Sequence, residues 1–177
     1  VHNLALVRYD PASIGNTHVE RVQFTGGALE SGQKVYQVGR TTQGKWGSES
    51  VTVSDIRPVT LPLPMVPFFR QTNLDLIHTK GDKTGFLGGL LTDKAGRASA
   101  LWACFPNHAG DDGPDWWLGI PATVINDFLA DPSGGFAMGV EWGRTGLIDA
   151  RRRGLGNDEA AQIERHDPGS RNLLQVG

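Results

Sequence analysis

Short apolar runs, and stretches in which apolar and polar residues alternate, recur along most of this chain. Both patterns have the length of a β-strand, and alternation is typical of a strand with one buried face. In residues 19–25, for example, Val22 and Phe24 would share one face. The pattern therefore predicts a mainly β fold. The predicted strands are 4–9, 19–25, 34–38, 48–59, 74–78, 90–92, 98–105 and 116–121.

Helical spacing is clearest over residues 122–130, where apolar positions recur three and four residues apart. Pro121 stands at or near the first turn, where its missing N–H costs nothing. Residues 131–135 contain a proline and two glycines and predict a break between two domains. The segments predicted beyond it are a strand at 138–142, helices at 147–153 and 158–165, and a strand at 173–176. This tail has too few apolar positions for a good core of its own, so we expect the start of a second domain.

Composition supports the β-rich interpretation and excludes some partners. The 177 residues include 24 glycines and 10 prolines, which favour many turns over a helical bundle. The net charge is −2 and the one basic run is at residues 151–153, so nucleic acid is not an expected partner. No apolar run is long enough to cross a membrane.

Candidate chemistry outside the middle of the chain is sparse. Cys104 lies in an apolar run, and we expect a buried small hydrophobe without an internal disulfide. The five histidines have no metal-ligand spacing, and a structural role is expected for His78. Asp111, Asp112 and Asp115 predict a solvated acidic loop, with calcium ligation as the alternative. No cofactor and no metal are therefore expected.

The middle of the chain, residues 79–105, carries the most specific pattern. A glycine-rich turn is predicted at residues 85–89, followed by a hairpin whose charged turn is 93–97. Trypsin-like serine proteases place their nucleophilic serine before a Gly-Gly pair in such a turn, where backbone N–H groups point at the oxyanion. Here the residue before Gly88-Gly89 is Leu87, whose side chain cannot attack a carbonyl.

Taken in order, these features resemble the HtrA/Deg family of serine proteases, and in particular its large yeast nuclear and plant members with a duplicated, degenerate protease unit. The segments that carry the resemblance are 2–10, 33–39, 84–89, 118–121 and 136–140. The resemblance implies a partial first trypsin-like barrel (1–28), a complete second barrel with its exit helix (29–131) and the beginning of a PDZ domain (132–177).

The resemblance also implies roles for single residues. It places Asn3 at the position of the triad acid and Leu87 at that of the nucleophile, and the catalytic histidine would lie ahead of Val1. Gly85, Leu87 and Gly88 would then be the remnant of the oxyanion loop. A backbone nest that still binds an anion and a plain structural turn both remain open for this loop. Ser99 is too far along the next strand to replace the nucleophile.

Three functions follow as hypotheses. The first is a catalytically degenerate domain that acts as a scaffold or regulatory module beside a PDZ domain. The second is an active serine endopeptidase of the same family, and the third is a peptide-binding module. The PDZ domain would bind peptide C-termini through a loop and strand that contain Ala137, Met138, Gly139 and Val140. The resemblance further implies association with other copies of the chain or with other protease units of the same protein.

Overall fold

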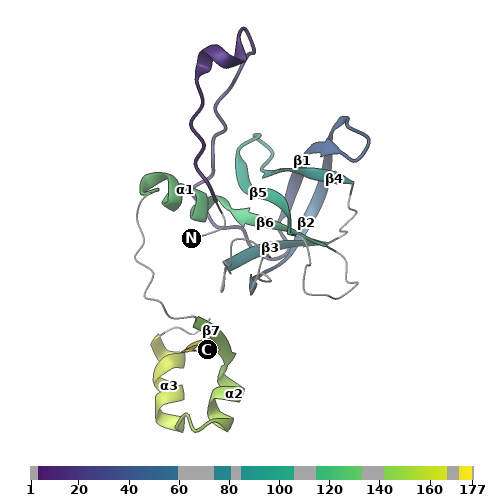
Figure 1. The fold of residues 1–177 in the computed structure, drawn as a ribbon. Helices are drawn as coiled ribbons and strands as arrows, with labels where there is room; N and C mark the ends of the chain where they lie inside the picture. The colour runs from purple at the N-terminus through teal and green to yellow at the C-terminus, as the bar shows by residue number, and fades with distance from the viewer. Residues whose placement is uncertain are drawn as a thin grey trace. The chain divides into compact units, whose positions relative to one another are not determined.

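The computed structural model describes residues 4–59, 74–80, 85–105, 115–132, 142–166 and 172–176. The chain divides into two compact units, residues 1–135 and 136–177, and each unit is described by itself (Figure 1). No helix among the described residues is long and apolar enough to cross a membrane.

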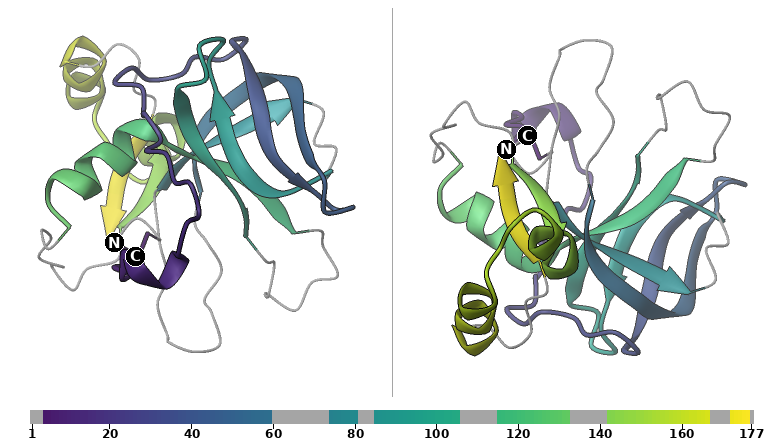
Figure 2. Two further views of the ribbon diagram at one scale, coloured as in Figure 1. Left: turned by 90° about the horizontal axis from the view of Figure 1, so that it is seen from above. Right: turned by 90° about the horizontal axis from the view of Figure 1, so that it is seen from below.

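The first unit is built around a closed antiparallel barrel of six strands (Figure 1, Figure 2). The barrel order is β1-β2-β3-β6-β5-β4, with each strand paired to both neighbours. The strands are β1 (Lys34–Thr41), β2 (Trp46–Val59), β3 (Leu74–Lys80), β4 (Phe86–Thr92), β5 (Ala98–Phe105) and β6 (Trp116–Pro121). This confirms the predicted mainly β fold, and the closed barrel is of the trypsin-like kind.

Alternation along the strands fills the barrel. Val35 on β1, Val53 on β2 and Leu91 on β4 are almost fully buried in one cluster inside it. A second cluster lies between the barrel wall and the helix α1 (Ala122–Ala130), which buries Ile125 against Leu118 and Ile120. The predicted helix is thus confirmed, and its apolar stripe explains why it packs on the barrel.

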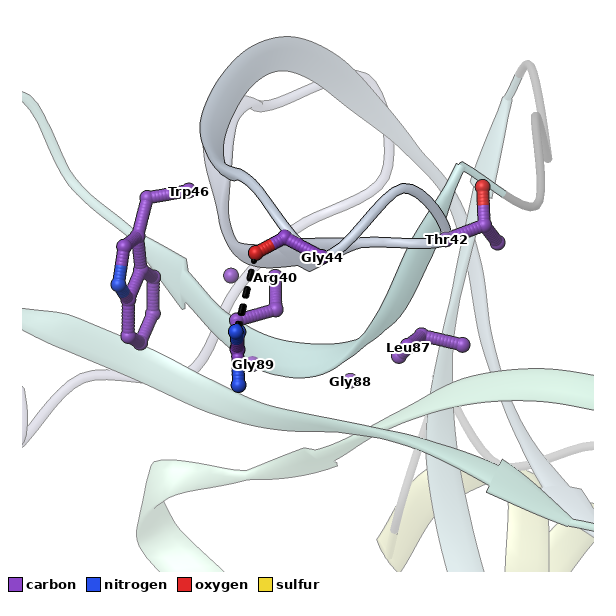
Figure 3. A pocket seen from close by; sticks show the side chains of 8 residues that line it. Arg40, Thr42, Gly44, Trp46, Leu87, Gly88 and Gly89 are labelled. Carbon is purple, nitrogen blue, oxygen red and sulfur yellow. Dashed lines mark hydrogen bonds between the residues drawn. The ribbon is translucent and has the colours of Figure 1, made fainter.

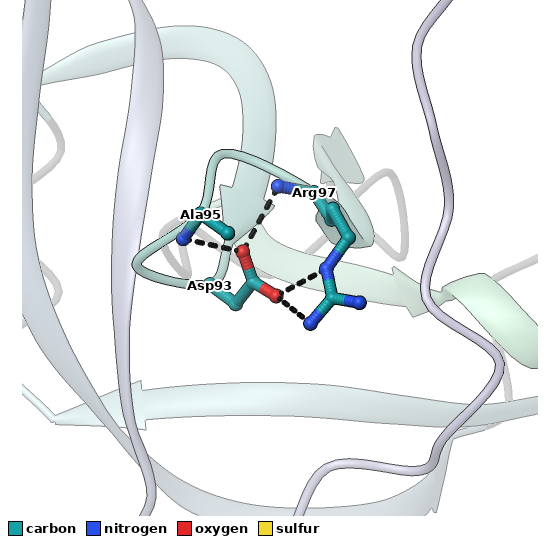
Figure 4. A network of polar contacts seen from close by, with 3 residues as sticks. All are labelled: Asp93, Ala95 and Arg97. Carbon is teal, nitrogen blue, oxygen red and sulfur yellow. Dashed lines mark hydrogen bonds and ion pairs between the residues drawn. The ribbon is translucent and has the colours of Figure 1, made fainter.

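The hairpin of β4 and β5 is confirmed, and its turn is held by one carboxylate (Figure 4). Asp93 Oδ1 accepts hydrogen bonds from the backbone N–H groups of Ala95 (2.8 Å) and Arg97 (3.0 Å). Its Oδ2 accepts from Arg97 Nε at 2.8 Å and pairs with Nη2 at 2.8 Å. An aspartate at the start of a turn stabilises it in this way by replacing backbone partners.

Two predicted strands near the beginning of the chain are wrong. Residues 4–9 and 19–25 form no strand. They are coil, and the segment between them contains one short helical turn, Pro11–Ile14 (Figure 1). The attachment of this segment to the barrel includes the bridge of Phe24 with Ala98 and the flanking backbone hydrogen bonds of Gln23 and Thr25. Alternation alone does not make a strand, because a strand also requires a partner for its backbone groups.

Two further expectations need correction. The turn predicted at residues 85–89 is not a turn, since β4 already begins at Phe86. Cys104 is half-buried rather than buried, because it stands near the end of β5, paired with Trp117 of β6.

The second unit holds a two-stranded antiparallel sheet and two helices. Its elements are β7 (Trp142–Gly146), α2 (Leu147–Arg152), α3 (Asn157–His166) and β8 (Asn172–Val176). The two predicted helices and the last strand are confirmed within a residue or two at each end. The strand predicted at 138–142 lies outside the described residues except for Trp142, where β7 begins.

Candidate functional site

Leu87, the residue at the expected nucleophile position, lies near the beginning of β4 with its side chain on the outside of the barrel. Its neighbour Phe86 is 5% exposed, whereas Leu87 is 62% exposed. Regular alternation would place Leu87 on the face of the buried Leu91, but the register of β1 and β4 shifts between the pairs Gly39–Gly89 and Thr41–Phe86. This irregularity breaks the alternation and lets Leu87 face outward. The residue that the sequence predicts at the nucleophile position is therefore an exposed apolar side chain.

The two glycines after Leu87 let β4 approach β1 more closely than side chains permit. Gly88 and Gly89 have φ values of +125° and +143°, a region that other residues rarely adopt. Gly89 pairs with Gly39 across the strands, and a Cβ added to Gly39 would overlap the carbonyl oxygen of Gly88. The Gly-Gly pair therefore serves barrel closure, whatever else it does.

An open hollow of about 500 Å³ lies beside Leu87 (Figure 3). It is formed by β4 and by the hairpin of β1 and β2. The residues that line it are Gly39, Arg40, Thr42, Gly44, Trp46, Leu87, Gly88 and Gly89. Figure 3 shows the Arg40 guanidinium between the Trp46 indole at one end and Leu87 at the other.

The hairpin tip fixes the position of Arg40. Its Nε and Nη2 atoms donate to the carbonyl oxygen of Gly44 at 3.3 Å and 3.1 Å. Arg40 also pairs directly with Trp46 in the register of β1 and β2, so the two side chains share one face. Thr42 N–H donates to the carbonyl oxygen of Gly85 at 3.0 Å and joins the hairpin to the residues before β4.

The described residues that line the hollow carry one charge, the positive charge of Arg40. No residue of its lining has a carboxylate, and Arg40 has no ion-pair partner among the residues that the structure describes. A guanidinium remains protonated at every physiological pH. The site is thus one fixed cation between two exposed apolar side chains.

Two of the three residues predicted as the remnant of the oxyanion loop, Leu87 and Gly88, line the hollow. The third, Gly85, accepts the hydrogen bond from Thr42 N–H. Asn3 lies outside the described residues, as do Ala137, Met138, Gly139 and Val140. The sequence did not predict Arg40 and Trp46 as site residues, because only the strand register brings them beside β4.

Two other side chains that could attack a carbonyl, Ser99 and Cys104, are buried or weakly activated. Ser99 is 4% exposed on β5. Burial raises the pKa of the Cys104 thiol, and the Asp115 carboxylate raises it further, which lowers the fraction of reactive thiolate. His78 Nε2 accepts a hydrogen bond from Arg57 Nε at 3.2 Å.

Metal ligation finds no support in the part of the chain that is described. Within those ranges, no three His, Cys, Asp or Glu side chains come together closely enough to hold an ion. Asp111 and Asp112, for which calcium ligation was the alternative, lie outside the described residues.

Comparison with protein-family profiles finds no match. Comparison with characterised proteins finds relatives that align over almost the whole chain. The chain is 30% identical over 180 residues to the Pro-apoptotic serine protease NMA111 of Eremothecium gossypii, which covers 98% of this chain and 18% of that protein. It is 25% identical to the PDZ domain-containing protein C23G3.12c of Schizosaccharomyces pombe, over 98% of the chain and 18% of that protein.

A plant relative agrees with the fungal ones. Protease Do-like 7 of Arabidopsis thaliana is 25% identical over 204 residues, which cover 99% of this chain and 19% of that protein. The chain therefore spans less than a fifth of the length of these relatives. Activities of the relatives as whole proteins need not reside in the part that this chain matches.

Proposed function

Because the chain belongs to the HtrA/Deg type of trypsin-like proteins, we propose that it is a catalytically degenerate protease unit that acts as a scaffold or regulatory module. One observation carries the proposal: Leu87, the residue predicted at the nucleophile position, is an exposed apolar side chain. Without a hydroxyl or thiol there, the covalent route of a serine protease is closed. The predicted replacement of the triad acid by Asn3 points the same way, because an amide carries no charge to stabilise an imidazolium.

The intact barrel supports a structural role for such a unit. Six paired strands and two apolar clusters give it a packed core of its own. A stable body without a nucleophile can still contribute surface to an assembly and hold neighbouring domains in place.

Covalent labelling tests the proposal. The chain, bovine trypsin and the variant Leu87→Ser are treated with a fluorophosphonate probe, and labelling is read by intact-protein mass. We expect trypsin alone to be labelled. The variant restores only a hydroxyl, and a serine without an activating base is a weak nucleophile. Labelling of the unmodified chain, abolished by replacing one specific serine, would overturn the proposal and establish the active endopeptidase instead.

We further propose that residues 132–177 begin a peptide-binding PDZ domain, with residues 137–140 in its carboxylate-binding loop. The name of the Schizosaccharomyces relative supports this, since it is a PDZ domain-containing protein. A groove that takes a peptide by strand addition needs both a sheet edge and a second wall. Screening C-terminal peptides against this chain and against a form extended beyond residue 177 tests it. Binding by the extended form alone is expected, and binding by neither contradicts it.

The relatives' names favour proteolysis by the longer protein, and we propose that a separate unit performs it. Casein turnover by the full-length protein should then be unchanged by Leu87→Ala in this unit. A loss of turnover with a normally folded variant would place the chemistry, or its control, at Leu87.

A further inference from the structure

We propose that the hollow beside Leu87 binds an acidic peptide segment of a partner protein, with a peptide carboxylate on Arg40 and apolar side chains on Trp46 and Leu87. This inference rests on the proposed function, because it takes the site to hold a partner without cleaving it. It names the kind of partner that a degenerate unit of this sort would recognise.

The side chains of Arg40, Trp46 and Leu87 face the same way. Arg40 and Trp46 are a directly opposed pair across β1 and β2, so they share the outer face. Leu87 is 62% exposed, at the point where the register of β4 against β1 shifts. All three line one hollow (Figure 3).

This face is open to solvent, and its two ends are apolar. Trp46 is 78% exposed and Leu87 62% exposed. An indole and an isobutyl group left in water on either side of a guanidinium are typical of residues that gain energy on binding. Trp and Arg are also the side chains that most often dominate protein interfaces.

Arg40 is held in place but is not neutralised by any residue that the structure describes. Two of its nitrogens are tied to Gly44, which limits the rotamers that binding would have to freeze. A guanidinium has five N–H donors, so donors remain for a ligand. A carboxylate is the planar acceptor that fits this fork best.

The charge and the volume of the hollow favour a peptide over other anionic partners. Nucleic acid or a membrane surface would call for several neighbouring cations, whereas Arg40 is the one cation among the described residues of the lining. A volume of about 500 Å³ suits a few side chains. One carboxylate flanked by apolar side chains matches both the charge and the two apolar ends.

The test uses a fluorescent peptide in which aspartate is flanked by phenylalanine and leucine, and a matched peptide with asparagine in place of aspartate. Binding to the whole chain is measured by fluorescence anisotropy at two salt concentrations. We expect saturable binding below about 1 mM for the acidic peptide and at least about tenfold weaker binding for the asparagine peptide. This comparison needs no mutation, so it holds even if a variant misfolds.

Variants locate the site. Arg40→Gln should weaken binding of the acidic peptide about tenfold, to an affinity near that of the asparagine peptide. Trp46→Ala should weaken both peptides. The matched control is Arg21→Gln, which removes an exposed arginine outside the hollow and should leave binding unchanged. Circular dichroism shows that each variant is folded.

Several results would overturn the inference: no saturable binding, equal binding of the two peptides, or full binding by Arg40→Gln. Concentration-dependent self-association that blocks the peptide would show that a second copy occupies the hollow, and would also overturn it. The proposed function fails separately, through covalent labelling by the fluorophosphonate probe. An unlabelled chain that binds no peptide would therefore leave the scaffold role standing and remove only this partner.

Discussion

Gly39 and Gly89 lie opposite each other where β1 and β4 close the barrel, with no room for a side chain between them. A Cβ added to Gly89 would overlap the carbonyl oxygen of Val38 and lie 2.8 Å from the Cα of Gly39. Both atoms belong to backbone, which cannot rotate away as a flexible side chain can. The close approach therefore requires glycine at positions 39 and 89, whereas at Gly88 the positive φ of +125° is what favours glycine.

Gly89→Ala should consequently destabilise the barrel by about 3 kcal/mol or more, because it combines overlap with a positive φ. The measurement is the free energy of unfolding from urea titration followed by circular dichroism. Gly26→Ala is the matched control, since its Cβ would meet nothing within 4 Å. Equal stability of the two variants would show that β1 and β4 are not this close in solution.

Two leucines of the same strand give a second prediction. Leu91 is 0% exposed inside the barrel, whereas Leu87 is 62% exposed. Leu91→Ala should cost about 2–5 kcal/mol of unfolding free energy, because it removes buried surface and leaves a cavity. Leu87→Ala should change it by no more than about 0.5 kcal/mol. A large loss with Leu87→Ala would mean that this side chain is packed, and it would contradict an open site.

The turn of the β4–β5 hairpin makes stability depend on pH. The backbone N–H of Arg97 most strongly, and then the Arg97 guanidinium and the Ala95 N–H, hold the pKa of Asp93 below its ordinary value of 3.8. A carboxyl group with a lowered pKa in the folded state stabilises the fold above its unfolded pKa. This stabilisation is lost as the pH falls through the folded pKa.

We therefore expect the unmodified chain to lose more stability between pH 6 and about pH 3 than Asp93→Asn does. The asparagine can still accept from the turn N–H groups but cannot pair with the Arg97 guanidinium. Urea midpoints at the two pH values provide the measurement. Glu49→Gln removes an exposed carboxylate elsewhere on the barrel and should follow the unmodified chain. If Asp93→Asn loses as much stability between the two pH values as the unmodified chain, Asp93 is not the group responsible for the pH dependence.

The barrel strands could be predicted from the sequence because their alternation and their packing agree. Val35, Val51 and Val53 fall on the buried face that their spacing predicts. The strand predicted from the apolar run at residues 4–9 is wrong, and Leu6 and Val7 of that run stay exposed. The pattern of apolar and polar residues predicts which face of a strand is buried. Whether the strand forms also depends on hydrogen-bond partners for its backbone groups, which come from elsewhere in the chain.

The site could be predicted only in its local part. A motif of consecutive residues was enough to find Leu87, because the Gly-Gly pair follows it directly. The same glycines suggested a turn, whereas they serve a close strand approach. Arg40 and Trp46 are six residues apart and join Leu87 through strand register, which no spacing in the sequence specifies. Long-range register is thus the part of the site that needed a structure.

The remaining prediction concerns the one cysteine. Burial raises the pKa of the Cys104 thiol above its ordinary value of 9.0, and the nearby Asp115 carboxylate raises it further. Only the thiolate reacts with iodoacetamide, so the folded chain should be alkylated several-fold more slowly at pH 8 than the chain in urea. The midpoint of the pH–rate profile should lie above 9.0 in the folded chain.

Removing the carboxylate separates the two causes. Asp115→Asn should lower the midpoint but leave it above that of the unfolded chain, because burial remains. Asp127→Asn is the control, since this exposed carboxylate on α1 does not act on the thiol. A folded midpoint at or below 9.0 would mean that Cys104 is an activated thiol. Such a thiol in the barrel wall would reopen the question of covalent chemistry, because a thiolate is itself a strong nucleophile.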